Sequence, residues 1–291
     1  MPPNHIKKSA RCLIVIFELA VSLSLALPLS ACQSTKSSIS TEERIDSLIG
    51  IIQSKLDNGK TMQAQFETEP LLKEHPTHPK VLTIMGLIDL ALRNNQRAVK
   101  HLKEAYVQDP TAGAALNLSS AYIAARNYPK AIKTLESGIK IAKDTKFIHI
   151  VRLYHNKALI HELRGEDDLA ILGYQQALYH SPGYILTLKN FGNLLEKNQR
   201  LDEAYRIFEK FSYACPACYY PVKKLARYAL KKKRYQSALS FLNTFIRNSN
   251  ILPHNEINAK KFIARIQRAA RSKKPDRSIS IKGKTKNLNR L

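Results

Sequence analysis

Cysteine spacing restricts the chemistry of this chain more than any other residue type. There are four cysteines, at Cys12, Cys32, Cys215 and Cys218. The last two enclose a Pro-Ala dipeptide, and this C-x-x-C spacing suits a local disulfide, a redox dithiol or half of a metal site. A redox dithiol normally opens a helix in a βαβ unit, and zinc needs two further ligands; the flanking sequence offers neither. In an oxidising compartment we therefore predict a disulfide between Cys215 and Cys218, with free thiols as the alternative.

Residues arranged for catalysis are not found in the sequence. The nine histidines are scattered, and His155 and His161 stand six residues apart, which places them on different faces of a helix. The acidic run 166–168 is expected to be a solvated helix start. The chain contains no H-E-x-x-H, P-loop, G-x-S-x-G or G-x-G-x-x-G motif. We therefore expect no enzymatic activity, no metal site and no cofactor.

The N-terminal region has the layout of an export signal. Lys7, Lys8 and Arg11 form a basic start, and residues 12–29 are almost wholly apolar apart from Glu18. A transmembrane anchor is the alternative, because this run of about 18 residues approaches the ~20 that span a bilayer. Small residues follow the apolar run, as at a cleavage site, so we predict a signal peptide over residues 1–31.

The segment Leu29-Ser30-Ala31-Cys32 resembles the bacterial lipobox. That resemblance implies cleavage after Ala31 and a covalent lipid, such as palmitate, on Cys32, which becomes the first residue of the mature protein. Gln33 follows in place of aspartate, which by the lipoprotein sorting pattern implies the outer membrane. The expected location is therefore the periplasmic side of the outer membrane, with Cys32 as the anchor.

The chain is strongly basic, with a formal net charge of +24. Such a balance favours acidic partners, and for an exported protein these are anionic lipids or acidic protein surfaces, with no nucleic acid expected. A merely solvated basic surface is the alternative. Hydrophobic residues make up 44% of the sequence, which is enough to form a packed core.

A repeat runs through the body of the chain. The stretches beginning at Met85, Lys157 and Phe191 place small residues, large apolar residues and a closing proline at matching offsets. Weaker copies extend the pattern in both directions. One column of alanines has spacings of 34, 33, 39, 34 and 34 residues, at Ala64, Ala98, Ala131, Ala170, Ala204 and Ala238. A second column of small residues precedes it, at Gly86, Ala158, Gly192 and Ala226.

This spacing resembles the tetratricopeptide repeat, a helix–turn–helix unit of about 34 residues. It predicts an all-α fold, a right-handed α-solenoid of about six units, in which small residues let paired helices approach closely. The expected units are 45–78, 79–111, 112–150, 151–184, 185–218 and 219–252. The step of 39 residues predicts either a longer helix or a protruding loop between the third and fourth units.

Three further segments flank the repeats. Residues 32–44 are polar and are predicted to be a linker, and residues 253–270 are predicted to be a capping helix with a polar outer face. Residues 271–291 are basic and poor in large apolar groups, which predicts a disordered tail. The tail either increases solubility or binds anionic envelope surfaces.

The first helices of such repeats line a concave groove, which predicts where a partner binds. In the first three units the expected groove residues are apolar to polar: Ile49, Gln53, Thr83, Leu87, Leu116 and Ser120. In the last three units they are mostly basic: Arg152, His155, Lys189, Asn193, Tyr220, Lys223 and Arg227. A basic groove suits an acidic peptide or a C-terminal carboxylate, and generic solvated side chains are the alternative.

Two residues in that groove resemble a known binding feature. Lys189 and Asn193 are similar to the carboxylate clamp of chaperone-binding tetratricopeptide domains. The clamp is incomplete here, because Lys224 stands where that pattern has asparagine.

The lipobox, the repeats directly after it and the extra length between units three and four together resemble the type IV pilus biogenesis lipoproteins, or pilotins. The resemblance implies a non-enzymatic scaffold that helps an outer-membrane secretin subunit reach the membrane and oligomerise. Tad-type pilus lipoproteins and the barrel-assembly lipoprotein with similar repeats are competing families. The basic tail and the C-x-x-C pair depart from the pilotin pattern.

Overall fold

The computed structural model describes residues 40–248 and 250–272. The predicted signal peptide, the predicted lipidation site Cys32 and nearly all of the basic tail lie outside the described residues. The helical structure begins at Thr41, so the last residues of the expected linker 32–44 belong to the first helix. None of the described helices is long and apolar enough to cross a membrane.

The described residues form thirteen α-helices and no strand, which confirms the predicted all-α class. The helices of the first three units are α1 (Thr41–Asp57), α2 (Thr61–Glu74), α3 (Pro79–Ala91), α4 (Asn95–Gln108), α5 (Ala112–Ala124) and α6 (Tyr128–Asp144). Those of the next three are α7 (Ile150–Leu163), α8 (Asp167–His180), α9 (Ile185–Lys197), α10 (Leu201–Ala214), α11 (Tyr219–Lys231) and α12 (Tyr235–Ile246), and α13 (Pro253–Ser272) follows them.

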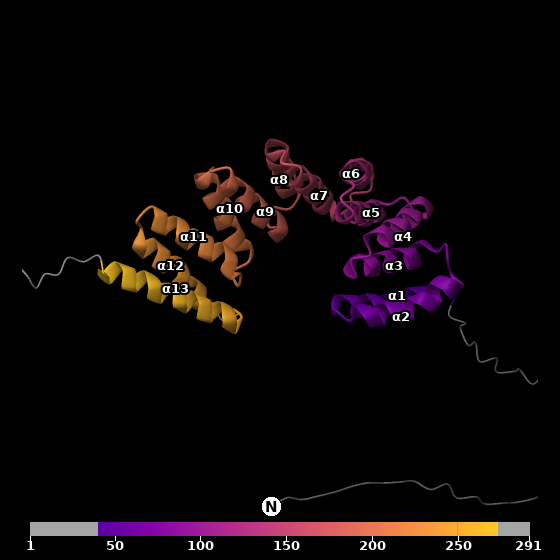
Figure 1. The fold of residues 1–291 in the computed structure, drawn as a ribbon, viewed down its shortest axis with the longest axis horizontal. Coiled ribbons are helices and arrows are strands. Elements are labelled where there is room, and N and C mark those ends of the chain that lie inside the picture. Colours follow the sequence, from indigo (N-terminus) through magenta and orange to yellow (C-terminus); the bar gives the residue numbers. More distant parts are fainter. Residues whose placement is uncertain (1–39, 249, 273–291) are drawn as a thin grey trace, which may run out of the picture. The chain divides into compact units, whose positions relative to one another are not determined.

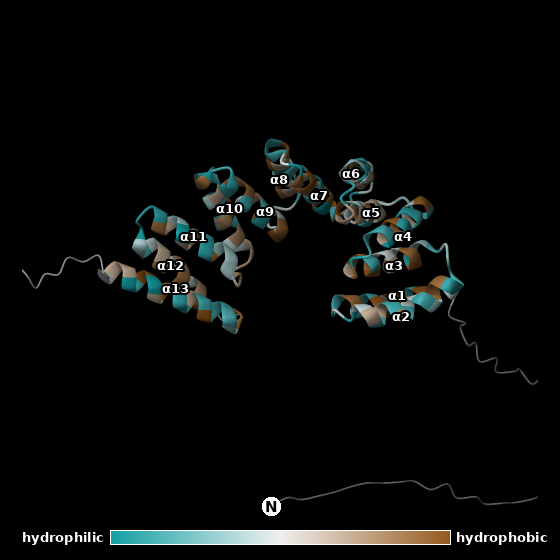
Figure 2. Ribbon diagram, viewed as in Figure 1, coloured by the Kyte–Doolittle hydropathy of each residue, from teal (hydrophilic) through white to brown (hydrophobic). Residues whose placement is uncertain are grey.

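Successive helices form antiparallel pairs, and each pair packs on the next (Figure 1). The pairs are α1–α2, α3–α4, α5–α6, α7–α8, α9–α10 and α11–α12, and α13 packs against both helices of the last pair. The main contacts between repeats are thus made between neighbours along the chain. This is the arrangement of a tetratricopeptide solenoid, in which no pair buries its apolar face alone. Figure 2 shows apolar and polar residues interspersed along the helices of each pair.

Small residues lie where the helices approach most closely. Five of the six alanines in the column have no exposed surface, and Ala204 is 3% exposed. Ala158 and Ala226 in the second column are also fully buried. A methyl group added at Gly192 would lie 2.7 Å from Cε1 of Phe208, so glycine leaves the space that this ring fills. Leu102 and Phe208, each four positions after an alanine of the column, therefore pack into the space left by Gly86 and Gly192.

The turn inside each pair has the same backbone geometry in all six units. One residue in each turn has a positive φ, and these residues are Gly59, Arg93, Arg126, Gly165, Gln199 and Lys233. They recur at the same spacings as the alanine column. The next amide donates back to a carbonyl five residues earlier, as from Asn94 to Asp89 at 2.8 Å, which closes the first helix. Four of these residues are not glycine, so composition alone does not indicate this conformation.

The step of 39 residues is divided between a longer helix and a loop. Helix α6 has 17 residues, whereas α4, α8 and α10 have 14 each. The loop after α6 contains Lys146 at a φ of 52°, outside the repeating set of turns. The amide of Phe147 donates to the carbonyl of Ala142 at 2.9 Å, and Phe147 packs against the apolar cluster shared by units two to four.

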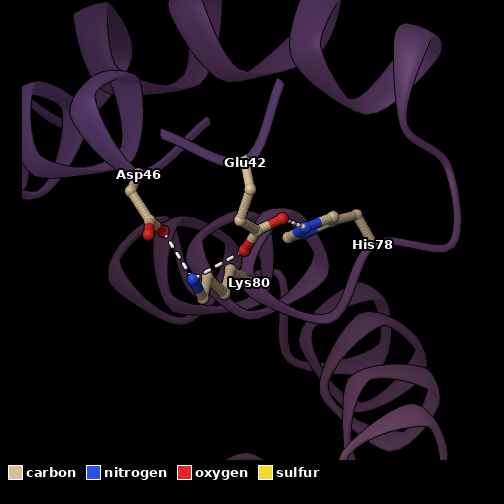
Figure 3. A network of polar contacts seen from close by, with 4 residues as sticks. All are labelled: Glu42, Asp46, His78 and Lys80. Carbon is tan, nitrogen blue, oxygen red and sulfur yellow. Dashed lines mark hydrogen bonds and ion pairs between the residues drawn. The ribbon is translucent and has the colours of Figure 1, made fainter. Parts of the chain in front are cut away.

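A network of ionic contacts joins the first helix to the second pair (Figure 3). Nζ of Lys80 lies 2.7 Å from Oε1 of Glu42 and 2.6 Å from Oδ1 of Asp46, and Nε2 of His78 lies 2.9 Å from Oε2 of Glu42. The hydrogen bonds from Lys80 and then His78 lower the pKa of Glu42 to about 2. A carboxyl whose pKa is lowered stabilises the fold above its ordinary pKa, and this contribution is lost as the pH falls towards 2.

One histidine is buried between units four and five. His155 is 5% exposed, and its Nδ1 lies 2.9 Å from Oγ1 of Thr187, which is fully buried. The rings of Tyr174 and Tyr184 lie on either side, at centroid distances of 5.6 and 5.7 Å. Burial lowers the pKa of His155 to about 4, because the charged ring would lose its hydration.

The close approach of α7 and α8 predicts that Gly173→Ala destabilises the protein. An added methyl would lie 2.8 Å from Cβ and 3.1 Å from the backbone Cα of Ala158, so the two helices must separate. We expect the free energy of unfolding, measured in urea, to fall by about 1–3 kcal/mol. The matched control is Gly50→Ala in α1, where nothing lies within 4 Å of the added methyl. Its free energy of unfolding should rise by roughly 0.5–1 kcal/mol. Equal effects at both sites would contradict this packing.

Burial of His155 predicts that stability falls as the pH is lowered from 6.5 to 4. In that window the unfolded chain binds a proton that the folded chain does not, which costs about 3 kcal/mol of stability across the window. His155→Gln keeps a partner for Thr187 and does not titrate. The difference in unfolding free energy between wild type and this variant should therefore shift in favour of the variant as the pH falls. His254→Gln, at an exposed position, is the control, and a shift of the same size there would refute the assignment.

Candidate binding groove

A large groove lies at the C-terminal end of the repeats. Its volume is about 980 Å³, and it is lined by α9, α10, α11 and α13. Helix α11 supplies its central wall. On that helix Val222, Ala226 and Ala229 are buried in the last repeat, and Leu225 is buried in the cluster of the preceding units. The residues on the remaining faces reach the solvent. The groove therefore depends on the register that packs α11 against its neighbours.

Positive charge dominates the walls of this groove. Its six basic side chains are Lys223, Lys224, Arg227 and Lys231 from α11 and Lys261 and Arg265 from α13. Residues 223, 227 and 231 are four apart and share one face of α11, and residues 261 and 265 do the same on α13. Glu196 is the one carboxylate that lines the groove, and it pairs with Lys224.

Aromatic rings form the apolar surface between these charges. Phe208 and Tyr205 come from α10, Tyr228 from α11 and Phe262 from α13. Nζ of Lys224 lies 5.4 Å from the ring centroid of Phe208, a distance suited to a cation–π contact. The groove thus combines cations with aromatic surface, and side chains of this kind bind anionic and apolar groups together.

The residues expected in the C-terminal half of the groove divide into two sets. Lys223 and Arg227 line it. Lys189, Asn193 and Tyr220 instead contact one another beside it. The hydroxyl of Tyr220 donates to Oδ1 of Asn193 at 2.6 Å, and Nζ of Lys189 lies 5.6 Å from the Tyr220 ring. This hydrogen bond uses the amide oxygen of Asn193, whereas a carboxylate would accept from its amide nitrogen, so the contact with Tyr220 fixes the orientation of the amide.

The structure places His155 away from any groove. The sequence predicted it as a groove residue, but its ring is buried between α7 and α9, where no partner reaches it. The neighbouring Arg152 is exposed on α7. The two residues occupy different positions of the same unit, and the rings of Tyr174 and Tyr184 pack against His155.

Three basic groove residues are not indicated by the repeat pattern. Lys231 lies at the end of α11, and Lys261 and Arg265 lie on α13, which the sequence predicted only as a cap. The signal available for α13 was the four-residue spacing of its basic residues beside Phe262 and Ile266. That spacing shows one charged face but does not indicate what the face lies against.

A smaller cavity of about 260 Å³ lies in the N-terminal units. Ile49, Gln53, Thr83 and Leu87, all expected groove residues, line it. The other two expected there are engaged within the fold. Leu116 is 3% exposed, and the hydroxyl of Ser120 donates to its carbonyl at 2.9 Å.

A disulfide joins Cys215 and Cys218 in the turn between α10 and α11, with the Cα atoms 5.3 Å apart. The amide of Cys218 also donates to the carbonyl of Cys215 at 3.0 Å. Both cysteines pack against the apolar cluster that contains Phe208 and Phe211. The crosslink therefore restrains the turn that leads into α11, the central wall of the groove. Among the described residues, no cluster of histidine, cysteine and carboxylate side chains has the arrangement of a metal site.

Comparison with known proteins identifies the repeats. A tetratricopeptide repeat family model matches residues 85–144. The Photosystem I assembly protein Ycf3 of Prochlorococcus marinus (strain MIT 9313) is 31% identical over 139 residues, 45% of this chain and 73% of that protein. Ycf3 of Synechococcus sp. (strain WH7803) is 34% identical over 125 residues, 43% of this chain and 65% of that protein.

A third relative and two solved structures share the repeats. The ycf37 protein of Guillardia theta is 28% identical over 91 residues, 31% of this chain and 51% of that protein. The chain thus spans about half to three quarters of the length of these relatives. PilF of Pseudomonas aeruginosa has a TM-score of 0.59 at 17% identity, over 77% of this chain and 98% of that structure.

PilW, described as a widely conserved type IV pilus biogenesis factor, has a TM-score of 0.58 at 15% identity, over 73% of this chain and 96% of that structure. At these identities the likeness to PilF and PilW shows the fold alone. The match to the repeat model and the likeness to Ycf3, together with the six helix pairs, show that the chain belongs to the tetratricopeptide repeat family.

Proposed function

We propose that this protein is a non-enzymatic scaffold that holds a partner protein in its C-terminal groove while a larger membrane assembly forms. The observation that carries the proposal is the groove itself, in which cations and aromatic rings from three helices face a common space. Aromatic side chains and arginine supply a large share of the affinity in protein interfaces, and this groove contains both. The repeats supply a preformed wall that needs little ordering on binding.

The finer proposal is a lipoprotein that assists assembly of a type IV pilus secretin at the outer membrane. The lipobox-like segment ending at Cys32 supports the anchor. PilF and PilW, which share the fold over nearly their whole length, support the assembly system. An envelope interaction protein of a Tad-type pilus, of another secretion system or of outer-membrane assembly is the alternative.

A second candidate function has its own observation. The Ycf3 relatives are named as Photosystem I assembly proteins, and their identity to this chain exceeds that of the pilus proteins. They support the wider idea of a factor that assembles a membrane complex. The two candidates differ in the partner, and both use the repeats as a binding scaffold.

Deletion of the gene tests the secretin assignment directly. We expect detergent-resistant secretin multimers to disappear from the outer membrane and to return when the wild-type chain is supplied. Cys32→Ala should move the protein out of the membrane fraction and fail to restore the multimers, because the lipid is its anchor. Ser34→Ala, two residues further along, is the matched control and should behave as wild type.

Two results would count against this assignment. Secretin multimers that survive the deletion would remove the pilus role and favour another membrane complex. An unmodified Cys32 in the intact protein, seen in the mass of its N-terminal peptide, would remove the lipid anchor.

A further inference from the structure

We infer that the C-terminal groove binds a partner segment in which carboxylates flank an apolar or aromatic side chain. This inference rests on the proposed scaffold function and specifies the chemistry of the partner at the same groove. It is carried by the unpaired cations of the walls, by their division into two rows and by the aromatic surface between them.

Most of the charge in the groove is uncompensated. Within the described part of the chain, Lys224 pairs with Glu196, whereas the other five cations of the groove make no ion pair with a carboxylate. The N-terminal cavity differs, because its Lys80 is held by Glu42 and Asp46. Like charges gathered around one concave surface repel each other and concentrate anions there. An acidic segment would relieve this repulsion.

The two basic rows come from separate helices that pack together. Lys223, Arg227 and Lys231 follow one face of α11, and Lys261 and Arg265 follow one face of α13. A segment lying between them meets cations on both sides, so carboxylates are favoured on both edges of the segment. The arginine on each row offers a planar fork that binds a carboxylate through two parallel hydrogen bonds.

The surface between the rows favours an apolar side chain at the centre of the segment. Phe208 is 3% exposed, and Tyr205, Tyr228 and Phe262 are partly buried around it. An apolar or aromatic anchor placed here is surrounded by rings and shielded from water, as at the centre of a protein interface. The flanking carboxylates then meet the more exposed cations, where ion pairs mainly provide specificity and speed of association.

A protein segment fits this groove better than a membrane surface does. The cations line a hollow of about 980 Å³ and do not form an exposed plane. Phospholipid headgroups in a bilayer present their phosphates at a flat interface, where only the rim of such a hollow is reached. The aromatic surface inside the hollow would then stay empty.

The test is binding of a labelled synthetic peptide, with glutamates flanking a central Phe-Leu pair, to the purified protein from residue 33 onward, followed by fluorescence anisotropy. We expect binding that weakens with added salt, because the outer ion pairs are screened. A peptide with glutamines in place of the glutamates, and another with alanines in place of Phe-Leu, should each bind about tenfold more weakly or worse.

The groove variant is Arg227→Glu combined with Lys261→Glu, one change on each wall. Its affinity for the acidic peptide should fall by about tenfold or more. Its affinity for a peptide with lysines in place of the glutamates should rise. Lys210→Glu reverses an exposed charge on α10 outside the groove and is the matched control. Circular dichroism on each variant shows whether the helices are intact.

Three outcomes would overturn the inference: no binding of the acidic peptide, equal loss in the Lys210→Glu control, or an unchanged affinity in the folded groove variant. Binding to phosphatidylglycerol vesicles that depends on the groove, without peptide binding, would assign the groove to lipid and also overturn it. None of these results affects the deletion experiment on secretin multimers, so the failure of this inference and of the proposed function can be told apart.

Discussion

Close approach of paired helices at small residues is the constraint on which the structure of this protein depends. Alanine recurs at one position of every second helix, and these alanines are almost completely buried. A larger side chain at that position would push the two helices of a unit apart. Since each unit packs on its neighbours, the displacement would be passed to the surfaces that face the next unit. The geometry of the groove depends on the same contacts, because they set the register of the helices that form its walls.

The same constraint explains why the groove is found at one end of the chain. Every unit buries its column alanine, and the units differ strongly in the residues that they expose. In α11 the positions that line the groove carry Lys223, Arg227 and Lys231, and α13 adds a second basic wall. The repeated core supplies the scaffold, and the sequence of the last unit and of α13 supplies the binding chemistry.

Residue spacing was enough to predict the fold class and the repeats, because the alanine column reflects packing that recurs in every unit. The sequence also indicated Lys223 and Arg227, which occupy groove positions of the repeat. It did not indicate the basic wall of α13, since the spacing of Lys261 and Arg265 says nothing about which helix they face. The prediction that His155 lines the groove was wrong, because the repeat register does not account for the rings of Tyr174 and Tyr184 that enclose it.

The turns within the units were also beyond prediction, because Arg93, Arg126, Gln199 and Lys233 adopt a conformation that usually favours glycine. The hydrogen bonds that close the preceding helices offset this cost. The close contact of Gly173 with Ala158 belongs to one unit and is not part of the repeat pattern. Features shared by all units were therefore visible in the sequence, and features of a single unit required the structure.

Hydrogen exchange in the variant Ala204→Leu, compared with the wild-type protein, would test the central claim most directly. The claim is that stability passes between neighbouring pairs through contacts at the small residues. It predicts faster amide exchange in α9 and α10 and, to a smaller extent, in α7, α8, α11 and α12, with α1 to α4 unchanged. A uniform increase in exchange over all the described helices, or none in α9 and α10, would contradict it.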